Sequence, residues 1–167
     1  EILGGGPVLL GWLKAAPFIG AFLMSVWLAA RPRMRHAGPA LLVSVATFGV
    51  CMVVFGLSTW IWLSILALFI SGAVDNVSVI IRHTLVQTRT PNQLRGRVSA
   101  VNSLFIECSN ELGAFESGLV ARLFGPVISV VTGGIGTLVV VGAVALCFPE
   151  IRKLRQMVSE EPEPPTV

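Results

Sequence analysis

Five long apolar runs divide the chain, and each has the length of a membrane-spanning helix. The runs cover residues 8–30, 37–57, 60–81, 98–124 and 126–148. About 20 apolar residues cross a bilayer core as a helix, and inside lipid every backbone polar group needs an internal partner. The alternation that marks a membrane barrel strand is absent from these runs. The pattern therefore predicts an all-α membrane protein with five transmembrane helices.

Charged residues separate the five runs into two groups. Runs 37–57 and 126–148 contain no charged residue, whereas the other three do. The charged residues within those three runs are Lys14, Asp75, Glu107, Glu111, Glu116 and Arg122. A charge in hydrocarbon is unfavourable unless it is paired or faces a polar cavity. We therefore expect the three charged helices to face something polar and the two uncharged helices to face lipid.

Composition and the placement of basic residues predict a membrane orientation. Hydrophobic residues make up 54% of the chain and charged residues only 13%, about half the charged fraction of a soluble domain. Ten of the twelve basic residues lie in alternate connections or after the last run. They are Arg31, Arg33, Arg35, Arg82, Arg89, Arg95, Arg97, Arg152, Lys153 and Arg155. The positive-inside rule then predicts an outer N-terminus and a cytoplasmic C-terminus.

This distribution also indicates the partner and the location. The net charge of +3 comes from membrane-flanking clusters, so we expect the lipid bilayer rather than nucleic acid as partner. We expect a multi-pass membrane protein.

The connections predict how the helices join. Pro17 lies inside the first run and should kink that helix, because proline removes a backbone hydrogen bond. Only residues 58–59 separate the second and third runs, which predicts an adjacent antiparallel pair. We expect the third helix to continue towards Thr90 and to end at Pro91. A compact loop over residues 92–97 should lead into the fourth span.

Small residues within the runs have structural interpretations. Gly133, Gly134 and Gly136 would permit close helix contact in the fifth span. The three cysteines lack the spacing of metal ligands, and we expect all of them to be buried as small apolar side chains. They are Cys51, Cys108 and Cys147.

The two ends of the chain differ from the runs. Residue 1 is Glu, residues 1–7 are Gly-rich, and no signal peptide precedes the first run. With an odd number of spans, these features suggest a C-terminal piece of a longer protein. Residues 158–167 are acidic and Pro-rich, which predicts a disordered cytoplasmic tail after a transmembrane domain over residues 1–157.

A polar stripe in the fourth run is the first candidate site. Its residues recur at steps of three or four, which places them on one helix face. They are Ser99, Ser103, Glu107, Asn110, Ala114 and Ser117, with Glu111 at the edge. Two carboxylates four residues apart repel when both are ionised, so the pair favours holding a proton. A proton-coupled pathway and a structural network with arginines of a neighbouring helix both account for the stripe.

A second candidate lies in the third run. Asp75 and Arg82 are seven residues apart, on one face of a helix, with Ser78 between them. One interpretation is a cytoplasmic gate. The other, which we favour here, is that Asp75 pairs with the basic segment Arg95–Arg97 near that end of the membrane.

Enzyme and metal motifs are absent from the sequence. No Gly-rich phosphate loop with a following Lys-Ser/Thr occurs. His36 and His83 are far apart and have no cluster of other ligands around them. We therefore expect neither an enzyme nor a bound metal or cofactor.

A longer pattern carries a family resemblance. It consists of Asp75-Asn-Val-Ser-Val-Ile-Ile-Arg82, Thr90-Pro91, Arg95-Gly-Arg-Val-Ser-Ala-Val-Asn-Ser-Leu-Phe105, Ser109-Asn-Glu-Leu-Gly-Ala-Phe-Glu-Ser-Gly118 and Gly133-Gly-Ile-Gly-Thr137. This pattern resembles the major facilitator superfamily, and within it the branch of the bacterial enterobactin exporter and related drug exporters. The cytoplasmic loop motif Arg95, Gly96, Arg97 belongs to the resemblance.

The resemblance implies a fold and a function. The five runs would be the eighth to twelfth helices of a twelve-helix secondary transporter, an incomplete C-terminal six-helix half that needs the missing N-terminal half as partner. Its eighth, tenth and eleventh helices would line the cavity, and the two halves would alternate their access. Ala114 replaces an acid expected there in many relatives.

The resemblance implies proton-coupled export of a small organic molecule of drug or siderophore type, by a multi-pass protein of the bacterial inner (cytoplasmic) membrane. Cavity or gate candidates are Asp75, Arg82, Glu107, Asn110 and Glu111. A non-transporting membrane subunit and an inactive truncated fragment remain as alternatives.

Overall fold

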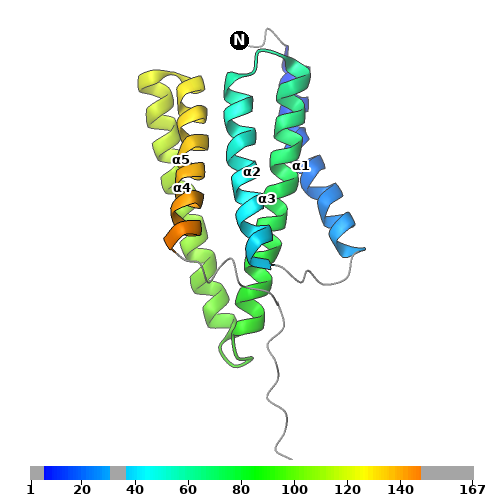
Figure 1. Ribbon diagram of the computed structural model, residues 1–167, viewed down its shortest axis with the longest axis vertical. Coiled ribbons are helices and arrows are strands. Elements are labelled where there is room, and N and C mark those ends of the chain that lie inside the picture. Colours follow the sequence, from blue (N-terminus) through cyan, green and yellow to red (C-terminus); the bar gives the residue numbers. More distant parts are fainter. Residues whose placement is uncertain (1–5, 31–36, 148–167) are drawn as a thin grey trace, which may run out of the picture.

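The described part of the chain forms five helices. It is a computed structural model that describes residues 6–30 and 37–147 (Figure 1). The helices are α1 (Pro7–Ala29), α2 (Ala37–Leu57), α3 (Ile61–Arg89), α4 (Arg95–Phe124) and α5 (Pro126–Cys147). They match the five apolar runs in number and order, and no strand occurs among the described residues. The expected all-α membrane architecture is confirmed. The predicted tail at residues 158–167 lies outside the described residues.

Four of the five helices have the length and apolar composition of a membrane span. They are α1 from Val8, α2, α3 and α5. Helix α4 is the longest, at 30 residues, but it carries charged and polar side chains and is less apolar than the other four helices. Its assignment as a fifth span over residues 98–124 therefore stays a prediction that depends on what covers those charges.

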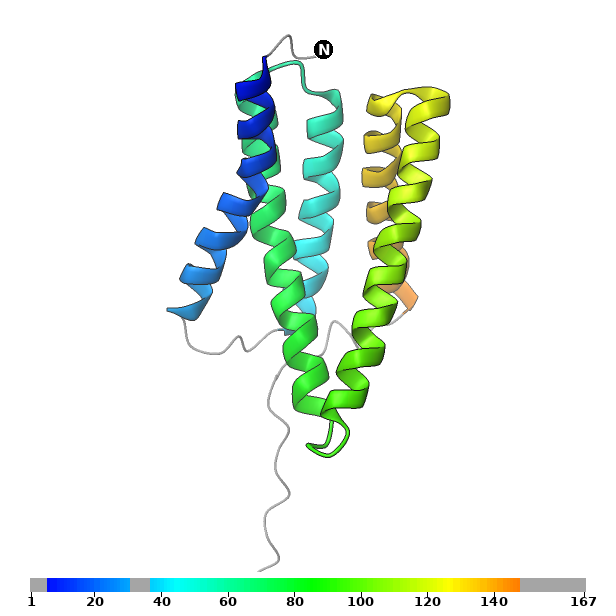
Figure 2. The same ribbon diagram turned by 180° about the vertical axis from the view of Figure 1, so that it is seen from behind.

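Helix α3 connects the two sides of the bundle. Among the described helices, α1 packs against α3 alone, and α2 packs against both α3 and α5. Helix α4 packs against α5 and touches α3 only slightly. Figure 2 shows α3 and α4 diverging from their shared turn as the arms of a V, and both views place α2 and α5 together on one side of it.

The turn between α2 and α3 is as short as predicted. The Oγ of Ser58 accepts a hydrogen bond from the backbone N–H of Trp60 at 3.2 Å and donates one to the Trp60 carbonyl at 3.0 Å. These two bonds close the chain reversal within three residues, 58–60. The adjacent antiparallel pairing of α2 and α3 is confirmed.

Helices α1 and α3 approach so closely that their backbones lie against each other at two glycines. A Cβ atom added to Gly20 would overlap the carbonyl oxygen of Phe69, and one added to Gly72 would overlap the carbonyl of Pro17. Pro17 lies inside α1, and Figure 2 shows the second half of α1 turning away from α3. The predicted kink is confirmed, because a helix-interior proline frees a carbonyl and bends the axis.

Glycines also set the contact between α2 and α5, but not all those expected. Gly134 of α5 lies against the carbonyl oxygen of Gly49 in α2, 2.9 Å from where a Cβ would be. Gly133 and Gly136 have open space around them, so the expectation of close contact is correct only for Gly134. Close backbone approach of this kind is the usual basis of helix association in lipid.

The cysteine prediction is partly wrong. Cys51 of α2 is buried, whereas Cys108 of α4 and Cys147 of α5 are exposed. The cause is that Cys108 belongs to α4, in which no residue is buried, and that Cys147 is the last residue of α5.

The fourth helix begins earlier than the sequence predicted, at the tip that joins α3 and α4. Helix α3 ends at Arg89, and Thr90 is extended before Pro91, as predicted. Helix α4, however, begins at Arg95, so the motif Arg95–Arg97 forms its first turn rather than a loop. The Leu94 N–H bonds to the Pro91 carbonyl at 2.9 Å and thus lets the chain re-enter a helix three residues earlier than expected.

Candidate functional site

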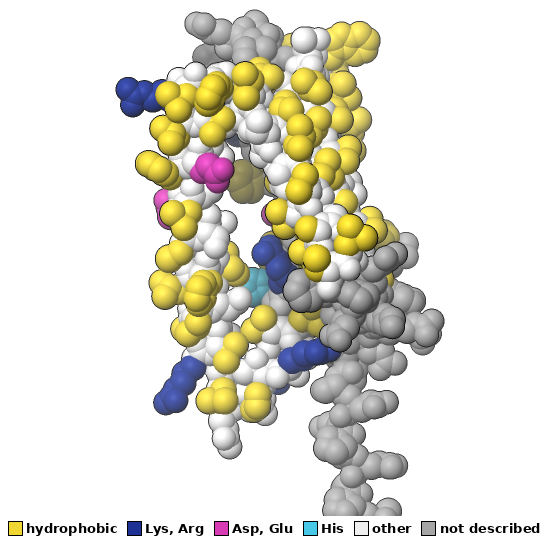
Figure 3. All heavy atoms as spheres, turned by 60° about the vertical axis from the view of Figure 1, so that its left-hand side comes forward, with side chains coloured by type: hydrophobic (Ala, Val, Ile, Leu, Met, Phe, Trp, Pro, Cys, Tyr) yellow, Lys and Arg dark blue, Asp and Glu magenta, His cyan; other side chains and the backbone are white. Residues whose placement is uncertain are grey.

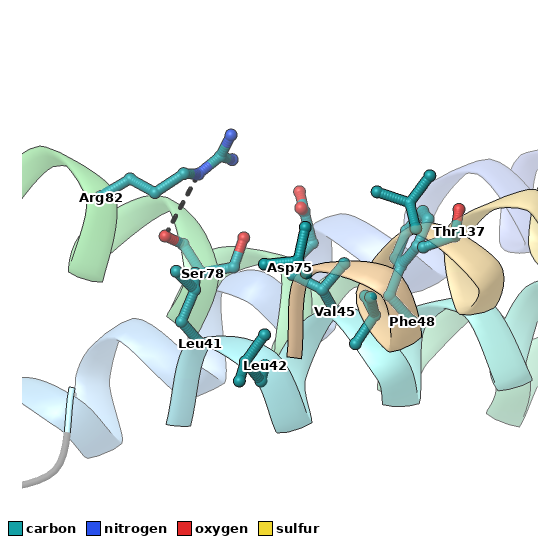
Figure 4. Close-up of a pocket in the computed structure, with 11 residues that line it drawn as sticks. Leu41, Leu42, Val45, Phe48, Asp75, Ser78, Arg82 and Thr137 are labelled. Carbon is teal, nitrogen blue, oxygen red and sulfur yellow. Dashed lines mark hydrogen bonds between the residues drawn. The ribbon is translucent and has the colours of Figure 1, made fainter. Parts of the chain in front are cut away.

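A groove of about 350 Å³ lies where α2, α3 and α5 meet (Figure 4). Its lining residues are Leu41, Leu42, Val45, Phe48, Asp75, Ser78, Arg82, Thr137, Val140, Val141 and Val144. Each helix contributes positions spaced by about one turn, so the groove runs along the helices for roughly two turns, about 10 Å. We call this surface the α2/α3/α5 groove. Its wall is apolar apart from α3 and Thr137.

The structure brings Asp75 and Arg82 onto the same wall of this groove. Both side chains leave α3 on one side, as their seven-residue spacing indicated (Figure 4). They do not bond to each other: the Arg82 Nε donates to the Ser78 carbonyl oxygen at 3.4 Å. Both residues are exposed. The groove therefore presents an acid and a base, each available to a further partner.

The position of Asp75 along α3 determines how unfavourable an unpaired carboxylate is there. Asp75 lies 14 residues after the start of α3, which is about 21 Å along the helix axis. A span that begins at Ile61 would hold Asp75 inside a hydrocarbon core, which is about 30 Å thick. An uncompensated carboxylate at this depth is unfavourable, so Asp75 needs a cation, a hydrogen-bond donor or a proton.

The pairing of Asp75 with the basic segment 95–97 is not formed. The Arg95 Nε donates instead to the carbonyl oxygen of Thr90 at 3.2 Å. Thr90 follows Asp75 by 15 residues, about 22 Å along α3. The interpretation that we favoured for Asp75 is therefore wrong within the described residues, because the tip extends beyond the level of the acid.

The polar stripe of α4 is exposed. Glu107, Asn110 and Glu111 all have exposed side chains, and α4 has no buried residue at all. Within the part of the chain that the structure describes, no arginine or lysine pairs with these carboxylates. A structural network with arginines of a neighbouring helix is thus not formed by the described helices. Figure 3 shows acidic side chains at the surface of this side of the molecule and a hollow between the helices.

The two candidate sets lie on separate arms of the V. Asp75 and Arg82 belong to α3, and Glu107, Asn110 and Glu111 belong to α4. The two helices contact each other only slightly, and no α4 residue lines the α2/α3/α5 groove. The described helices therefore present two polar surfaces rather than one assembled site.

Asn76 is a polar contact that the sequence analysis did not single out. Its Nδ2 donates to the carbonyl oxygen of Ala21 at 2.6 Å and to the Oγ of Ser25. The Ser25 Oγ donates in turn to the same carbonyl at 3.0 Å. This cluster joins α3 to the part of α1 beyond the kink. The sequence could have indicated this contact, because Asn76 is an amide inside an apolar run and lies next to Asp75.

A row of serines along α3 was also missed. Ser64, Ser71 and Ser78 recur every seven residues, and all three are buried. Ser71 donates to the Leu68 carbonyl at 2.8 Å, whereas the Oγ of Ser64 has no partner among the described atoms. Small side chains at this spacing allow neighbouring helices to approach closely.

Replacing Asn76 tests its contact with α1. Asn76→Ala removes both hydrogen bonds to α1, and we expect it to lower the free energy of unfolding by about 0.6 to 1.7 kcal/mol. Thermal unfolding of the purified full-length protein in detergent measures this change. Gln87→Ala, an exposed substitution on the same helix, is the control and should leave the midpoint unchanged. Equal midpoints for both variants would show that the Asn76 bonds do not hold α1.

Comparisons with known proteins show which family the chain matches. The chain matches, over residues 1–167, a family described as a transmembrane secretion effector. It is 28% identical over 149 residues to an enterobactin exporter of Escherichia coli O81 (strain ED1a), with 88% of this chain and 35% of the relative aligned. The corresponding enterobactin exporter of Shigella flexneri is also 28% identical, with 88% and 36% aligned.

The alignment covers only part of these relatives. The chain spans about a third of the length of the curated relatives that it matches. No solved structure matches the chain. The comparisons thus concern this chain and leave about two-thirds of each relative without a counterpart in this sequence.

Proposed function

Because the chain belongs to the transmembrane secretion effector family of the major facilitator superfamily, we propose that it is the C-terminal part of an exporter. The cargo is a small organic molecule, of the drug or siderophore type, and the driving force is an inward flow of protons. Two relatives named as enterobactin exporters support this class of activity rather than an enzymatic one. The rest of the relatives' length supplies the other half of the pathway.

The exposed carboxylates of α4 carry the proposal. Glu107 and Glu111 lie one helical turn apart, exposed and unpaired among the described residues. Acids at membrane depth that face a polar cavity are typical of proton pathways. In the proposed cycle these two carboxylates are the groups that carry the protons across the membrane. Asn110 beside them adds a hydrogen-bond donor and acceptor for cargo or water.

The transport cycle follows from the two-halves architecture. Helices α3 and α4 diverge from their shared turn (Figure 2), and in the proposed architecture a second half of the transporter faces them. Rocking of the halves exposes the space between them to one side of the membrane at a time. Protonation of Glu107 and Glu111 neutralises the surface of α4 that faces the other half of the transporter. Neutral side chains favour the intermediate state in which the two halves are closed to both sides of the membrane.

Transport by membrane vesicles tests the proposal. Inverted vesicles that contain the full-length protein should take up a fluorescent drug or a catecholate siderophore when their interior is acidified. A protonophore should abolish this uptake. Folded protein that moves none of the cargoes under any gradient would instead favour a non-transporting membrane subunit.

The length of the native product tests the truncated-fragment alternative. An epitope fused at the C-terminus should report a protein more than twice the 17.8 kDa of this chain in cell membranes. A band near 17.8 kDa would favour an inactive fragment or a subunit that needs a separate partner.

Orientation in the bacterial inner membrane gives a separate prediction. The Arg-rich tip between α3 and α4 should lie in the cytoplasm and the turn between α2 and α3 outside. Gln93→Cys at the tip should react with a membrane-impermeant maleimide only after the cells are permeabilised. Thr59→Cys in the opposite turn is the matched control and should react in intact cells, since both residues are exposed. The reverse labelling pattern would contradict the orientation.

A further inference from the structure

We propose that a wedge between α1 and α3 binds one acyl chain of an anionic phospholipid from the cytoplasmic leaflet. The residues that line this space, which we call the α1/α3 wedge, are Gly20, Leu23, Met24, Trp27, Phe69 and Ala73. The inference takes from the proposed function only the orientation of the helices in the membrane. It does not depend on whether the protein exports a cargo.

The kink of α1 creates the wedge. At Gly20 the two backbones lie against each other, and beyond this point the second half of α1 turns away from α3 (Figure 2). The space that opens between them has a volume of about 300 Å³. The indole N–H of Trp27 is the one polar side-chain group among its lining residues. The wedge is therefore suited to a hydrocarbon chain and not to water.

The wedge lies in the cytoplasmic half of the membrane in the proposed orientation. Ala73 follows the start of α3, Ile61, by 12 residues, about 18 Å along the helix axis. The midplane of a hydrocarbon core about 30 Å thick lies about 15 Å from its outer edge, so Ala73 is just past it. Gln87 lies 14 residues further, about 21 Å along α3. One leaflet with its headgroups is about as thick.

The width of the wedge argues for a single chain rather than a further helix. The Asn76 Nδ2 donates to the Ala21 carbonyl oxygen at 2.6 Å and to the Ser25 Oγ, so α1 and α3 stay joined beyond the kink. A helix with its side chains is about 10–12 Å in diameter and does not fit between two helices held this closely. An acyl chain is a single line of methylene groups and can enter a gap that widens gradually.

The charges at the cytoplasmic end favour an anionic headgroup. Residues 76–106 contain no acidic residue, and residues 2–74 contain none either. Three arginines fall within residues 31–36, directly after α1 in the sequence. The charged side chains that the structure describes at this end are all exposed and basic: Arg82, Arg89, Arg95 and Arg97. Basic clusters on the cytoplasmic side of transmembrane helices are typical of sites for anionic lipids.

Gln87 marks where the headgroup lies. It follows Phe69 by 18 residues, which is five helical turns, so the two share one side of α3. Its side chain is exposed, and its amide offers two N–H groups to a phosphate. Trp27 lies near the open end of the wedge, where an indole ring suits the boundary between hydrocarbon and headgroups.

Tryptophan quenching by brominated lipids tests the inference. All tryptophans of the full-length protein except Trp27 are replaced by phenylalanine, and the protein is reconstituted in phosphatidylethanolamine vesicles. Phosphatidylglycerol brominated on its acyl chains is then added in increasing proportion. A protein that keeps Trp12 alone is the matched control, because Trp12 is also on α1, is 59% exposed against 48% for Trp27, and does not line the wedge.

A wedge that binds the lipid predicts saturable quenching of Trp27. Half of the effect should be reached with at least about fivefold less brominated phosphatidylglycerol than brominated phosphatidylethanolamine. Quenching of Trp12 should rise in proportion to either lipid. Proportional quenching of Trp27, the same result with both lipids, or no quenching at any proportion would each overturn the inference. The last of these results would mean that protein fills the wedge.

A matched pair of charge substitutions tests the position of the headgroup. Gln87→Glu places a negative charge on the wedge side of α3, and Gln93→Glu makes the same change in the exposed turn beyond Pro91. Gln87→Glu should weaken the preference of Trp27 for phosphatidylglycerol several-fold at low ionic strength, and Gln93→Glu should leave it nearly unchanged. Equal preferences in the two variants would overturn the placement of the headgroup beside Gln87.

Export by the same single-tryptophan protein separates the two proposals. Saturable quenching of Trp27 in a protein that moves no cargo would support the lipid site and contradict the exporter function. Normal export with proportional quenching would overturn the lipid site and leave the exporter function intact.

Discussion

Glu107→Gln in the full-length protein should abolish proton-driven export while leaving the transporter folded. Glutamine keeps the size and hydrogen-bonding capacity of the side chain but cannot take up or release a proton. Glu107 is exposed on α4 and pairs with no described basic residue, so its neutralisation removes no ion pair within the five helices. The loss should therefore appear in flux and not in stability.

Uptake into inverted vesicles under an imposed pH gradient measures this effect. Glu116→Gln is the matched control, because Glu116 is the same residue type on the same helix and is also exposed. Nine residues separate the two, which places them on opposite faces of α4. Glu116→Gln should retain most of the flux, and Glu111→Gln should show an intermediate or complete loss. Undiminished flux for Glu107→Gln would remove this residue from the proton pathway.

A loss of stability in the same variant has a different meaning. If Glu107→Gln and Glu111→Gln lower the thermal midpoint together with the flux, the acids hold the bundle to a neighbouring helix outside this chain. That result would favour the structural interpretation of the α4 stripe, in which its carboxylates pair with basic residues of a neighbouring helix.

Gly72→Val should cause the largest loss of stability among the substitutions considered. A Cβ at position 72 would overlap the backbone of Pro17, and backbone cannot move aside as a flexible side chain can. Because α1 packs against α3 alone among the described helices, it has no second contact to hold it in place. We expect a cost of about 3 kcal/mol or more, at the upper end of the range for overpacking.

The thermal midpoint of the full-length protein in detergent measures this cost. Gly142→Val on α5 is the control, since a Cβ at position 142 would meet no atom within 4 Å. The control tests the general effect of a β-branched residue in a membrane helix. A Gly72→Val midpoint equal to that of the control would show that α1 does not cross α3 at this glycine.

Several features of the fold were determined by the sequence because they depend on a single segment. The helices occupy the apolar runs, since hydrocarbon requires each segment to satisfy its own backbone. Pro17 bends α1, and Pro91 ends α3 just after Thr90, because proline acts on the residues beside it. The same locality explains why the seven-residue spacing of Asp75 and Arg82 was sufficient to place them on one face.

Other features required the tertiary structure. Which of Gly133, Gly134 and Gly136 meets α2 depends on the rotation of α5, and only Gly134 does. The expected partner of Asp75 was wrong because the tip of α3 and α4 carries Arg95 far from it. Asn76 became visible only when α1 lay beside α3.

Helix identity, length and one-sided polarity were thus determined by the sequence alone, because each follows from the chemistry of one segment in lipid. The tertiary structure decided which faces meet, where backbones interlock and which charges stay open. Those outcomes depend on the rotation and tilt of whole helices, and a small change in either exchanges one contact residue for its neighbour. The divergence of α3 from α4, which leaves both polar surfaces uncovered, is the clearest feature of this second kind.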